Sequence, residues 1–198
     1  MARPKSFDPD AALDRAVEIF WTRGYEATSV DDLVSGIGIK RQSLYDTFGD
    51  KRALYLASLD RYEARLREEM IAVLEAPGEG VGAIESVLRS VIDPREREGM
   101  RCGCFLVNAA VEVAMRDPEA ALRVHRNAER IESALLAALE RASAAGELPE
   151  RRADGRAGLR ALARYLANAL RGLQVALRMG TPEAELRDVV DVTLSALR

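Results

Sequence analysis

The sequence is poor in the residues that mark most catalytic and metal-binding proteins. Its 198 residues include one histidine, two cysteines and one tryptophan, and aromatic side chains amount to 5%. The His-Glu-x-x-His and Gly-x-Ser-x-Gly motifs and a glycine-rich phosphate loop are missing from it, and these are common signatures of enzymes. We therefore expect neither an enzymatic activity nor a cofactor.

Features of secreted and membrane proteins are equally scarce. Two cysteines and the lack of an Asn-x-Ser/Thr sequon are typical of a reducing compartment. The first ten residues, MARPKSFDPD, contain no apolar segment and do not resemble a signal peptide. The longest apolar run, from Cys104 to Met115, is interrupted by Asn108 and Glu112 and is too short to span a bilayer. The expected location is the cytoplasm.

A general excess of positive charge is also missing. The chain carries 29 Lys and Arg against 32 Asp and Glu, which gives a formal net charge of −3. Counted over residues 1–52, eight basic residues stand against nine acidic ones. Any contact with nucleic acid must therefore depend on a few well-placed side chains rather than on overall attraction.

Helical periodicity dominates what the sequence does contain. With 48% hydrophobic and 31% charged residues, the composition is that of a globular protein, and no segment alternates as a strand would. We predict an all-α fold of about nine helices, with an N-terminal domain at 1–50 and a C-terminal helical domain at 51–198. The clearest helices are expected at about 9–23, 51–74, 81–92, 103–115, 118–145, 155–179 and from 182 onwards.

Residues 28–48 contain two short apolar patterns separated by a glycine. The apolar positions are Val30, Leu33, Val34 and Ile37 before Gly38, and Ile39, Leu44 and Phe48 after it. Thr28, with Asp31 three residues later, is predicted to cap the first helix in the manner of a capping box. The pattern predicts a helix-turn-helix, in which the second helix enters the major groove of DNA.

The second of these helices has a wide polar face. An arginine suits guanine or phosphate, a glutamine suits adenine, and an aspartate accepts from cytosine. The predicted DNA contacts are Thr28, Lys40, Arg41, Gln42, Ser43, Tyr45, Asp46, Thr47 and Lys51. The alternative is an ordinary short surface helix.

The segment from Gly38 to Lys51, GIKRQSLYDTFGDK, resembles the DNA-binding signature of TetR/AcrR-type regulators, Gly-Val-Ser-x-x-x-Leu-Tyr-x-x-Phe-x-x-Lys. The family's preceding pattern, Ala-x-x-x-Phe-x-x-x-Gly-Tyr-x-x-Thr-[Ser/Thr], is matched from Ala16 to Ser29. The resemblance covers about residues 8–60. It implies a homodimer, usually a repressor, whose C-terminal domain binds a small molecule and thereby releases a double-stranded operator.

One position departs from the family pattern. Lys40 stands where the family usually has a serine that caps the recognition helix, and a lysine cannot accept from the free amides there. We hypothesise that Lys40 contributes a phosphate or guanine contact instead.

The ligand site is expected between the C-terminal helices from 51–74 to 155–179. The candidate wall residues are Phe105, Leu106, Asn108, Ala109, Glu112 and Met115, because two polar residues four apart interrupt an apolar helix. The alternative is that Asn108 and Glu112 only face solvent. The helix at 51–74 follows the N-terminal domain without a linker and is the expected lever between ligand and DNA.

Two leucine-rich faces bear on assembly. Leu159, Leu162, Leu166, Leu170, Leu173 and Leu177 lie close to a heptad spacing, and Val190 and Leu194 belong to a similar face in the last helix. Both faces pack either into their own domain or across a two-fold axis as a four-helix dimer interface.

Cys102 and Cys104 flank Gly103, two residues apart, at the expected start of a helix. They are interpreted as small apolar core residues, with a reactive sensor thiol near a helix N-terminus as the alternative. The whole pattern favours a ligand-responsive DNA-binding regulator. A helical small-molecule binding protein or thiol-based sensor without operator binding is the second hypothesis.

Overall fold

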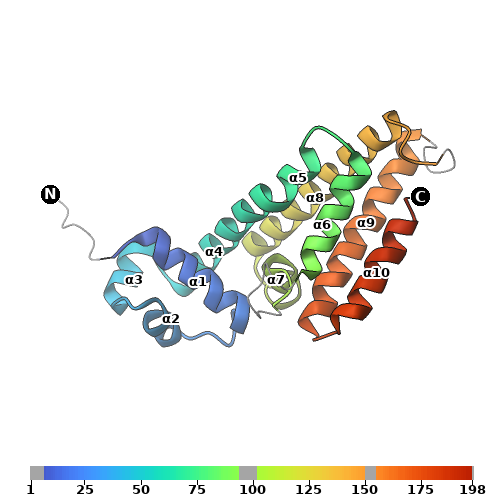
Figure 1. Cartoon of the computed structure of the whole chain (residues 1–198). Helices are drawn as coiled ribbons and strands as arrows, with labels where there is room; N and C mark the ends of the chain where they lie inside the picture. Colours follow the sequence, from blue (N-terminus) through green and yellow to red (C-terminus); the bar gives the residue numbers. More distant parts are fainter. Residues whose placement is uncertain (1–6, 94–101, 150–154, 198) are drawn as a thin grey trace.

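The computed structural model describes residues 7–93, 102–149 and 155–197. In these ranges the chain forms helices only, which confirms the all-α prediction. The helices are α1 (Pro9–Arg23), α2 (Val30–Ile37), α3 (Arg41–Phe48), α4 (Lys51–Leu66), η1 (Arg67–Ile71), α5 (Ala72–Glu75), α6 (Gly80–Ile92), α7 (Phe105–Glu112), α8 (Pro118–Ala144), α9 (Gly155–Arg178) and α10 (Glu183–Ser195). Figure 1 shows α1 to α3 at one end of an elongated molecule and the bundle of α6, α8, α9 and α10 at the other.

The first three helices form a compact unit, here called the reading unit (residues 7–50). Asp8 caps α1 by accepting from the amide of Asp10 at 2.9 Å, and Gly24 ends it with φ 88°. Gly38 ends α2 in the left-handed conformation, φ 78°, which a residue with a Cβ rarely adopts. The turn at Gly38 therefore sets the angle between α2 and α3.

The cap of α2 lies one residue later than the sequence predicted. Ser29, not Thr28, is the N-cap, and its hydroxyl accepts from the amide of Asp32 at 3.0 Å. The Asp32 carboxylate accepts in return from the Ser29 amide at 2.8 Å, which completes the capping box. The prediction of Thr28 with Asp31 was wrong, because the Thr28 side chain is buried and donates to the carbonyl of Gly24 at 2.6 Å.

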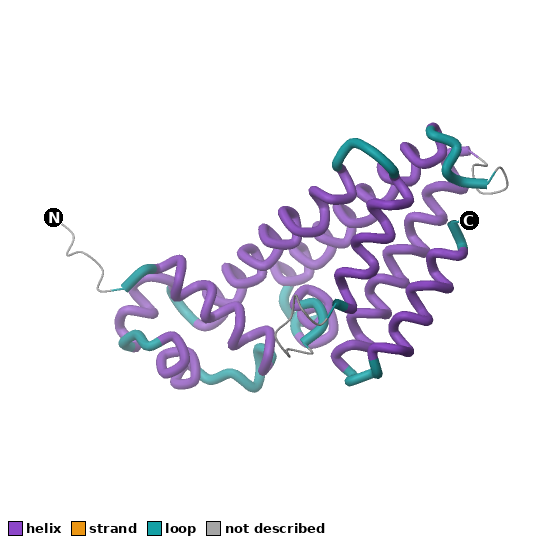
Figure 2. The backbone as a smooth tube through the Cα atoms, in the orientation of Figure 1, coloured by secondary structure: helices purple, strands orange, loops and turns teal. Residues whose placement is uncertain are grey.

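One long rod leads from the reading unit into the bundle. It begins at the cap Asp50, whose carboxylate accepts from the Ala53 amide at 2.7 Å, and it runs through α4, η1 and α5 to Glu75, as the sequence predicted within a residue. The π-helical turn η1 interrupts it. Figure 2 shows the rod as one continuous helical path.

Charged pairs join this rod to α8 along its length. The pairs are Arg52 with Asp117 and Glu119, Asp60 with Arg123 and Arg126, and Glu63 with Arg126 and Arg130. The Glu63 side chain is only 4% exposed, and a carboxylate buried this far requires the two arginines that contact it. Because these contacts span most of α4, α4 and α8 form one body.

The leucine faces of α9 and α10 pack into their own chain. Leu162, Leu166, Leu170, Leu173, Val190 and Leu194 are buried in the core, and Leu177 is partly buried against it. These side chains therefore form the inner face of the bundle, and the sequence prediction that placed them at a dimer interface was wrong.

Candidate nucleic-acid interface and ligand cavity

The recognition helix α3 buries a narrow stripe and exposes the rest. Leu44 is fully buried, whereas Tyr45 beside it is 41% exposed. Of the predicted DNA contacts, five are exposed (Lys40, Arg41, Gln42, Tyr45 and Asp46) and three are partly exposed (Ser43, Thr47 and Lys51). The fold thus presents a continuous polar face of α3 on the outside of the reading unit.

Two internal contacts orient the polar side chains of α3. Arg41 Nη2 donates to Asp31 Oδ1 of α2 at 2.5 Å, and Gln42 Nε2 donates to Asp46 Oδ1 at 2.8 Å. Both pairs are on the surface, where an ion pair contributes ~0–1 kcal/mol. A stronger partner can therefore displace them, and the Gln42 carbonyl oxygen remains available to accept.

Three further predicted DNA contacts, Thr28, Lys40 and Lys51, lie outside α3 and differ in exposure and in the contacts they make. Lys51 starts α4, and its ammonium lies 4.2 Å from the centroid of the Tyr25 ring. Thr28 is 0% exposed, so its side chain has no surface to offer a phosphate. Lys40 has the extended backbone of an N-cap and makes no capping hydrogen bond with its side chain, which confirms the expected lack of a cap.

Glu112, at the end of α7, joins the bundle to the reading unit. Its carboxylate accepts from the backbone amides of Tyr25 at 3.1 Å and Glu26 at 2.9 Å. Gly24 lies against the same carboxylate, and a Cβ at this position would come within 2.8 Å of Glu112 Oε1. The end of α1 and the end of α7 are therefore in direct, tight contact.

Trp21 makes a second junction between the two parts. Its indole Nε1 donates to the carbonyl of Gly103 at 3.1 Å, and its own carbonyl accepts from Arg178 of α9 at 3.3 Å. Its ring meets the edge of Tyr62 on α4 with centroids 5.1 Å apart. Trp21 of α1 thus contacts α4, α9 and the segment before α7.

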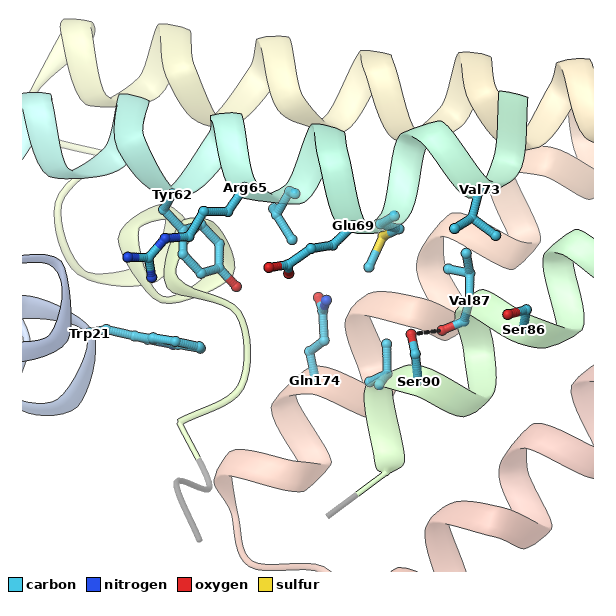
Figure 3. A pocket seen from close by; sticks show the side chains of 12 residues that line it. Trp21, Tyr62, Arg65, Glu69, Val73, Ser86, Val87, Ser90 and Gln174 are labelled. Carbon is cyan, nitrogen blue, oxygen red and sulfur yellow. Dashed lines mark hydrogen bonds between the residues drawn. The ribbon is translucent and has the colours of Figure 1, made fainter. Parts of the chain in front are cut away.

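A cavity of about 620 Å³ opens between the reading unit and the bundle. It is lined by Trp21, Tyr62, Arg65, Leu66, Glu69, Met70, Val73, Ser86, Val87, Ser90, Val91 and Gln174, from α1, α4, η1, α5, α6 and α9. Figure 3 shows Trp21 at one end, with the Glu69 carboxylate and the Gln174 amide directed toward one another across the space. Arg65 also reaches into it, but its Nη2 donates to Asp14 at 2.6 Å.

A smaller cavity of about 130 Å³ lies between α7, α8 and α9. Its walls are mostly apolar and include Leu106, Ile131 and Leu170. The buried Asn127 Oδ1 has no hydrogen-bond partner among the described residues. Gln174 lines this cavity as well as the larger one, and so stands between them.

Most residues predicted to wall the ligand site lie elsewhere. Of these residues, Leu106 lines the smaller of the two cavities described above. Phe105 is buried in an aromatic cluster, 5.6 Å from Tyr55 and 5.7 Å from Tyr62 between ring centroids. Asn108 Nδ2 donates to the carbonyl of Cys102 at 3.0 Å.

The other three predicted wall residues are excluded by their position. Ala109 is fully buried. Met115 is 89% exposed, because α7 ends at Glu112 rather than at the predicted Met115. Glu112 contacts the reading unit, as described above. The prediction was wrong for these residues because the sequence did not show which way α7 turns its polar side.

Neither cysteine forms a disulfide, and both are buried, with exposures of 8% for Cys102 and 3% for Cys104. The Cys102 carbonyl accepts from Asn108 and Arg178, and Cys104 borders the smaller cavity. Their burial agrees with the interpretation as core residues. A metal site is not formed by them: no cluster of three or more His, Cys, Asp or Glu occurs in the described ranges.

The sequence reasoning missed Trp21, Glu69 and Gln174 as candidate site residues. Trp21 is the chain's single tryptophan, and no motif around it indicates a ligand contact. Glu69 lies in the π-helical turn, which sequence periodicity does not reveal. Gln174 is a polar residue on the buried face of α9, 5% exposed, and that was the one available signal. Among the described residues, no helix combines the length and the apolar character needed to cross a membrane.

Comparison with known proteins gives a consistent result. The sequence model for bacterial regulatory proteins of the tetR family matches residues 12–58, and that for the tetracyclin repressor-like C-terminal domain matches residues 80–159. The HTH-type transcriptional regulator YezE of Bacillus subtilis (strain 168) is 37% identical over 197 residues, covering 100% of both chains. The HTH-type transcriptional repressor ComR of Escherichia coli (strain K12) is 31% identical over 193 residues, covering 97% of this chain and 90% of ComR.

Among solved structures, a cysteine mutant of the TetR family transcriptional regulator CifR, complexed with 26-bp double-strand operator DNA, superposes with a TM-score of 0.82 at 28% identity. The match covers 100% of both chains. The reduced form of NemR from E. coli has the same fold, with a TM-score of 0.82 at 17% identity. On the sequence matches and the helix-turn-helix at its N-terminus, the chain belongs to the TetR family of bacterial transcriptional regulators.

Proposed function

We propose that this protein is a dimeric repressor that binds a palindromic operator through α3 and leaves it when a small molecule occupies the C-terminal domain. The observation that carries the proposal is the exposed polar face of α3, held on a helix-turn-helix by the buried Leu44. Relatives named as regulators or repressors, and an operator complex of CifR, support it. The cytoplasm, where the DNA is, is the proposed location.

The contacts proposed for α3 follow from donor and acceptor chemistry. Arg41 reads guanine or binds phosphate once it leaves Asp31, and Gln42 reads adenine while Asp46 holds its amide. Tyr45 and Lys51 bind phosphates on either side. Because the reading unit has no general positive charge, these few side chains account for most of the affinity.

The proposed dimer interface is the outward face of α9 together with that of α10. Along α9 and the residue after it, uncharged exposed residues follow a 4-3-4-3-4 spacing: Ala161, Tyr165, Asn168, Gly172, Val175 and Met179. On α10, Val189 and Val192 are 47% and 66% exposed. Pairing of these faces about a two-fold axis forms a four-helix interface and places two α3 helices about one DNA turn apart, ~34–36 Å or somewhat more.

A selection of bound fragments from genomic DNA, followed by titration of Arg41→Ala, tests the proposal. We expect a single palindromic motif, and a loss of roughly 1–3 kcal/mol in binding on substitution of Arg41. Arg156→Ala is the matched control, since Arg156 is an exposed, ion-paired arginine on α9. Enrichment of no motif, or an equal effect of both substitutions, contradicts operator reading by α3 and favours a binding protein that does not act on DNA.

A further inference from the structure

We propose that the larger cavity binds an organic cation and that the bound cation contacts Trp21 of the reading unit directly. The ligand then contacts a side chain of α1, which is part of the DNA-binding end of the molecule. The consequence for DNA rests on the function proposed above, whereas the binding itself is independent of it.

Among the described residues that line the cavity, the unpaired charge is negative. Among the described residues Glu69 forms no ion pair, and its carboxylate points into the space. Arg65 also lines the cavity, but Asp14 of α1 holds it at 2.6 Å and accepts from Arg61 as well. An anionic ligand would have to compete with Asp14 and approach Glu69. A cation meets an unpaired carboxylate.

The surroundings of Glu69 suit a cation with apolar substituents. Trp21 and Tyr62 stand edge to face beside it, and aromatic rings attract cations through their π faces. Met70 and Val87 add apolar surface. Gln174 is 5% exposed, and its amide points into the cavity without a hydrogen-bond partner among the described residues. A ligand in the cavity can supply that partner.

The position of Trp21 gives the ligand a route to the reading unit. The opposite wall belongs to α4 and η1, and the charged pairs of Asp60 and Glu63 join α4 to α8. Trp21 packs on the ring of Tyr62 and makes one hydrogen bond to Gly103 and one from Arg178. A bulky ligand that enters between Trp21 and Glu69 therefore acts on contacts that join the reading unit to the bundle. This adds a direct route to the lever movement expected of the 51–74 helix.

Fluorescence tests the binding without DNA, because Trp21 is the only tryptophan in the sequence. The probes are tetraphenylphosphonium and tetraphenylborate, which have the same shape and opposite charge. We expect tetraphenylphosphonium to change the Trp21 emission saturably and tetraphenylborate to have little effect. Glu69→Gln should weaken the cation's binding roughly threefold to thirtyfold. Glu68→Gln, which removes the same charge one residue away and outside the cavity, should leave it unchanged.

Operator binding tests the coupling. Tetraphenylphosphonium should weaken operator affinity at least fivefold, which is the low end of ordinary allosteric coupling. In Trp21→Phe, which removes the indole N–H and shrinks the wall, the ratio of operator affinities with and without the cation should fall toward one. Binding of the cation to that variant is followed by calorimetry.

Each outcome decides one part of the proposal. Equal quenching by the borate, or equal effects of Glu69→Gln and Glu68→Gln, overturns the assignment of a cation site. An unchanged affinity ratio in Trp21→Phe, with the cation still bound, overturns the direct route through Trp21. If the protein binds the cation saturably but selects no operator sequence, the proposed function is wrong and the cation site is still supported.

Discussion

At Lys40 a cationic side chain occupies the N-cap position of α3. Its backbone is extended, with φ −75° and ψ 147°, and no side chain accepts from the first amides of the helix. A serine at an N-cap stabilises a helix by ~1 kcal/mol relative to a residue that cannot accept. A regulator that keeps lysine here gives up this stability, which is what a DNA contact at Lys40 would explain.

Lys40→Ser is therefore expected to change stability and affinity in opposite directions. The melting temperature should rise by about 2–4 °C, while operator affinity falls and the slope of log K against log salt decreases by about one per protomer. Thermal denaturation and a salt titration of binding measure the two effects. Lys40→Ala, which removes the charge without adding a cap, should lose affinity with no gain in stability. If operator affinity and salt slope are unchanged in both variants, Lys40 does not contact DNA.

Two residues show the limits of local patterns in the sequence. The capping box was predicted with Thr28 as the cap because Thr28 and Ser29 are both good caps and both have an aspartate three residues on. Ser29 is the cap because the Thr28 side chain is buried and donates a hydrogen bond to the carbonyl of Gly24. Glu112 was assigned to a ligand pocket because it interrupts an apolar helix, but its partners are the amides of Tyr25 and Glu26, 87 and 86 residues away in the sequence. Only the tertiary fold brings such partners together.

Between elements, a carboxylate on α1 clamps the reading unit to α4. Asp14 accepts from Arg61 through both of its oxygens at 2.9 Å and from Arg65 at 2.6 Å. Hydrogen bonding from Arg61, ahead of the opposing effect of partial burial, lowers the pKa of Asp14 below its ordinary value. A carboxyl whose pKa is lower in the folded state stabilises the fold above its unfolded pKa and loses that effect as pH falls through the folded pKa.

The stability difference between the wild type and Asp14→Asn should follow this sign. We expect the variant to be less stable by about 1 kcal/mol at neutral pH, because the pairs are partly exposed. The difference should be constant above about pH 5, begin to shrink near the ordinary aspartate pKa of about 3.9 and vanish below the lowered folded pKa. Urea denaturation of both proteins from pH 7 to pH 3 measures it. A difference that is independent of pH would show that Asp14 acts through packing alone.

Most helix boundaries were predictable because local signals mark them. Asp8 and Asp50 cap α1 and α4, and Gly24 and Gly38 end α1 and α2. The first helix accordingly has the predicted bounds 9–23, α4 begins at the predicted residue 51, and the turn lies at Gly38. The π-helical turn in the 51–75 rod was not predicted, since an added residue in a helix leaves the apolar pattern on either side intact. That turn places Glu69 in the cavity wall, so the site could not be assembled from periodicity.

At the scale of the whole molecule, α9 carries two seams on opposite sides. One contains leucines and packs into the core, and the other contains small or uncharged residues and lies outside. The sequence drew attention to the leucines because burial inside a bundle and burial between subunits require the same spacing. The outward seam is recognised only once the inner one has been accounted for by the fold.

Gly172 allows the outward seam to be tested without damage to the protomer. A Cβ at this position meets no atom of its own chain within 4 Å, and replacing a helical glycine improves helix propensity by up to ~1 kcal/mol. Gly172→Arg should therefore keep its helical circular dichroism but fail to dimerise, because an interface there would bury an unpaired charge.

Gly82→Arg on α6 is the matched control, since a Cβ there approaches only the side chain of Glu79. Sedimentation should give a monomer for the first and a dimer for the second. Since each half of a palindrome needs its own α3, operator affinity should be lost with the dimer, and a dimeric Gly172→Arg would place the interface elsewhere.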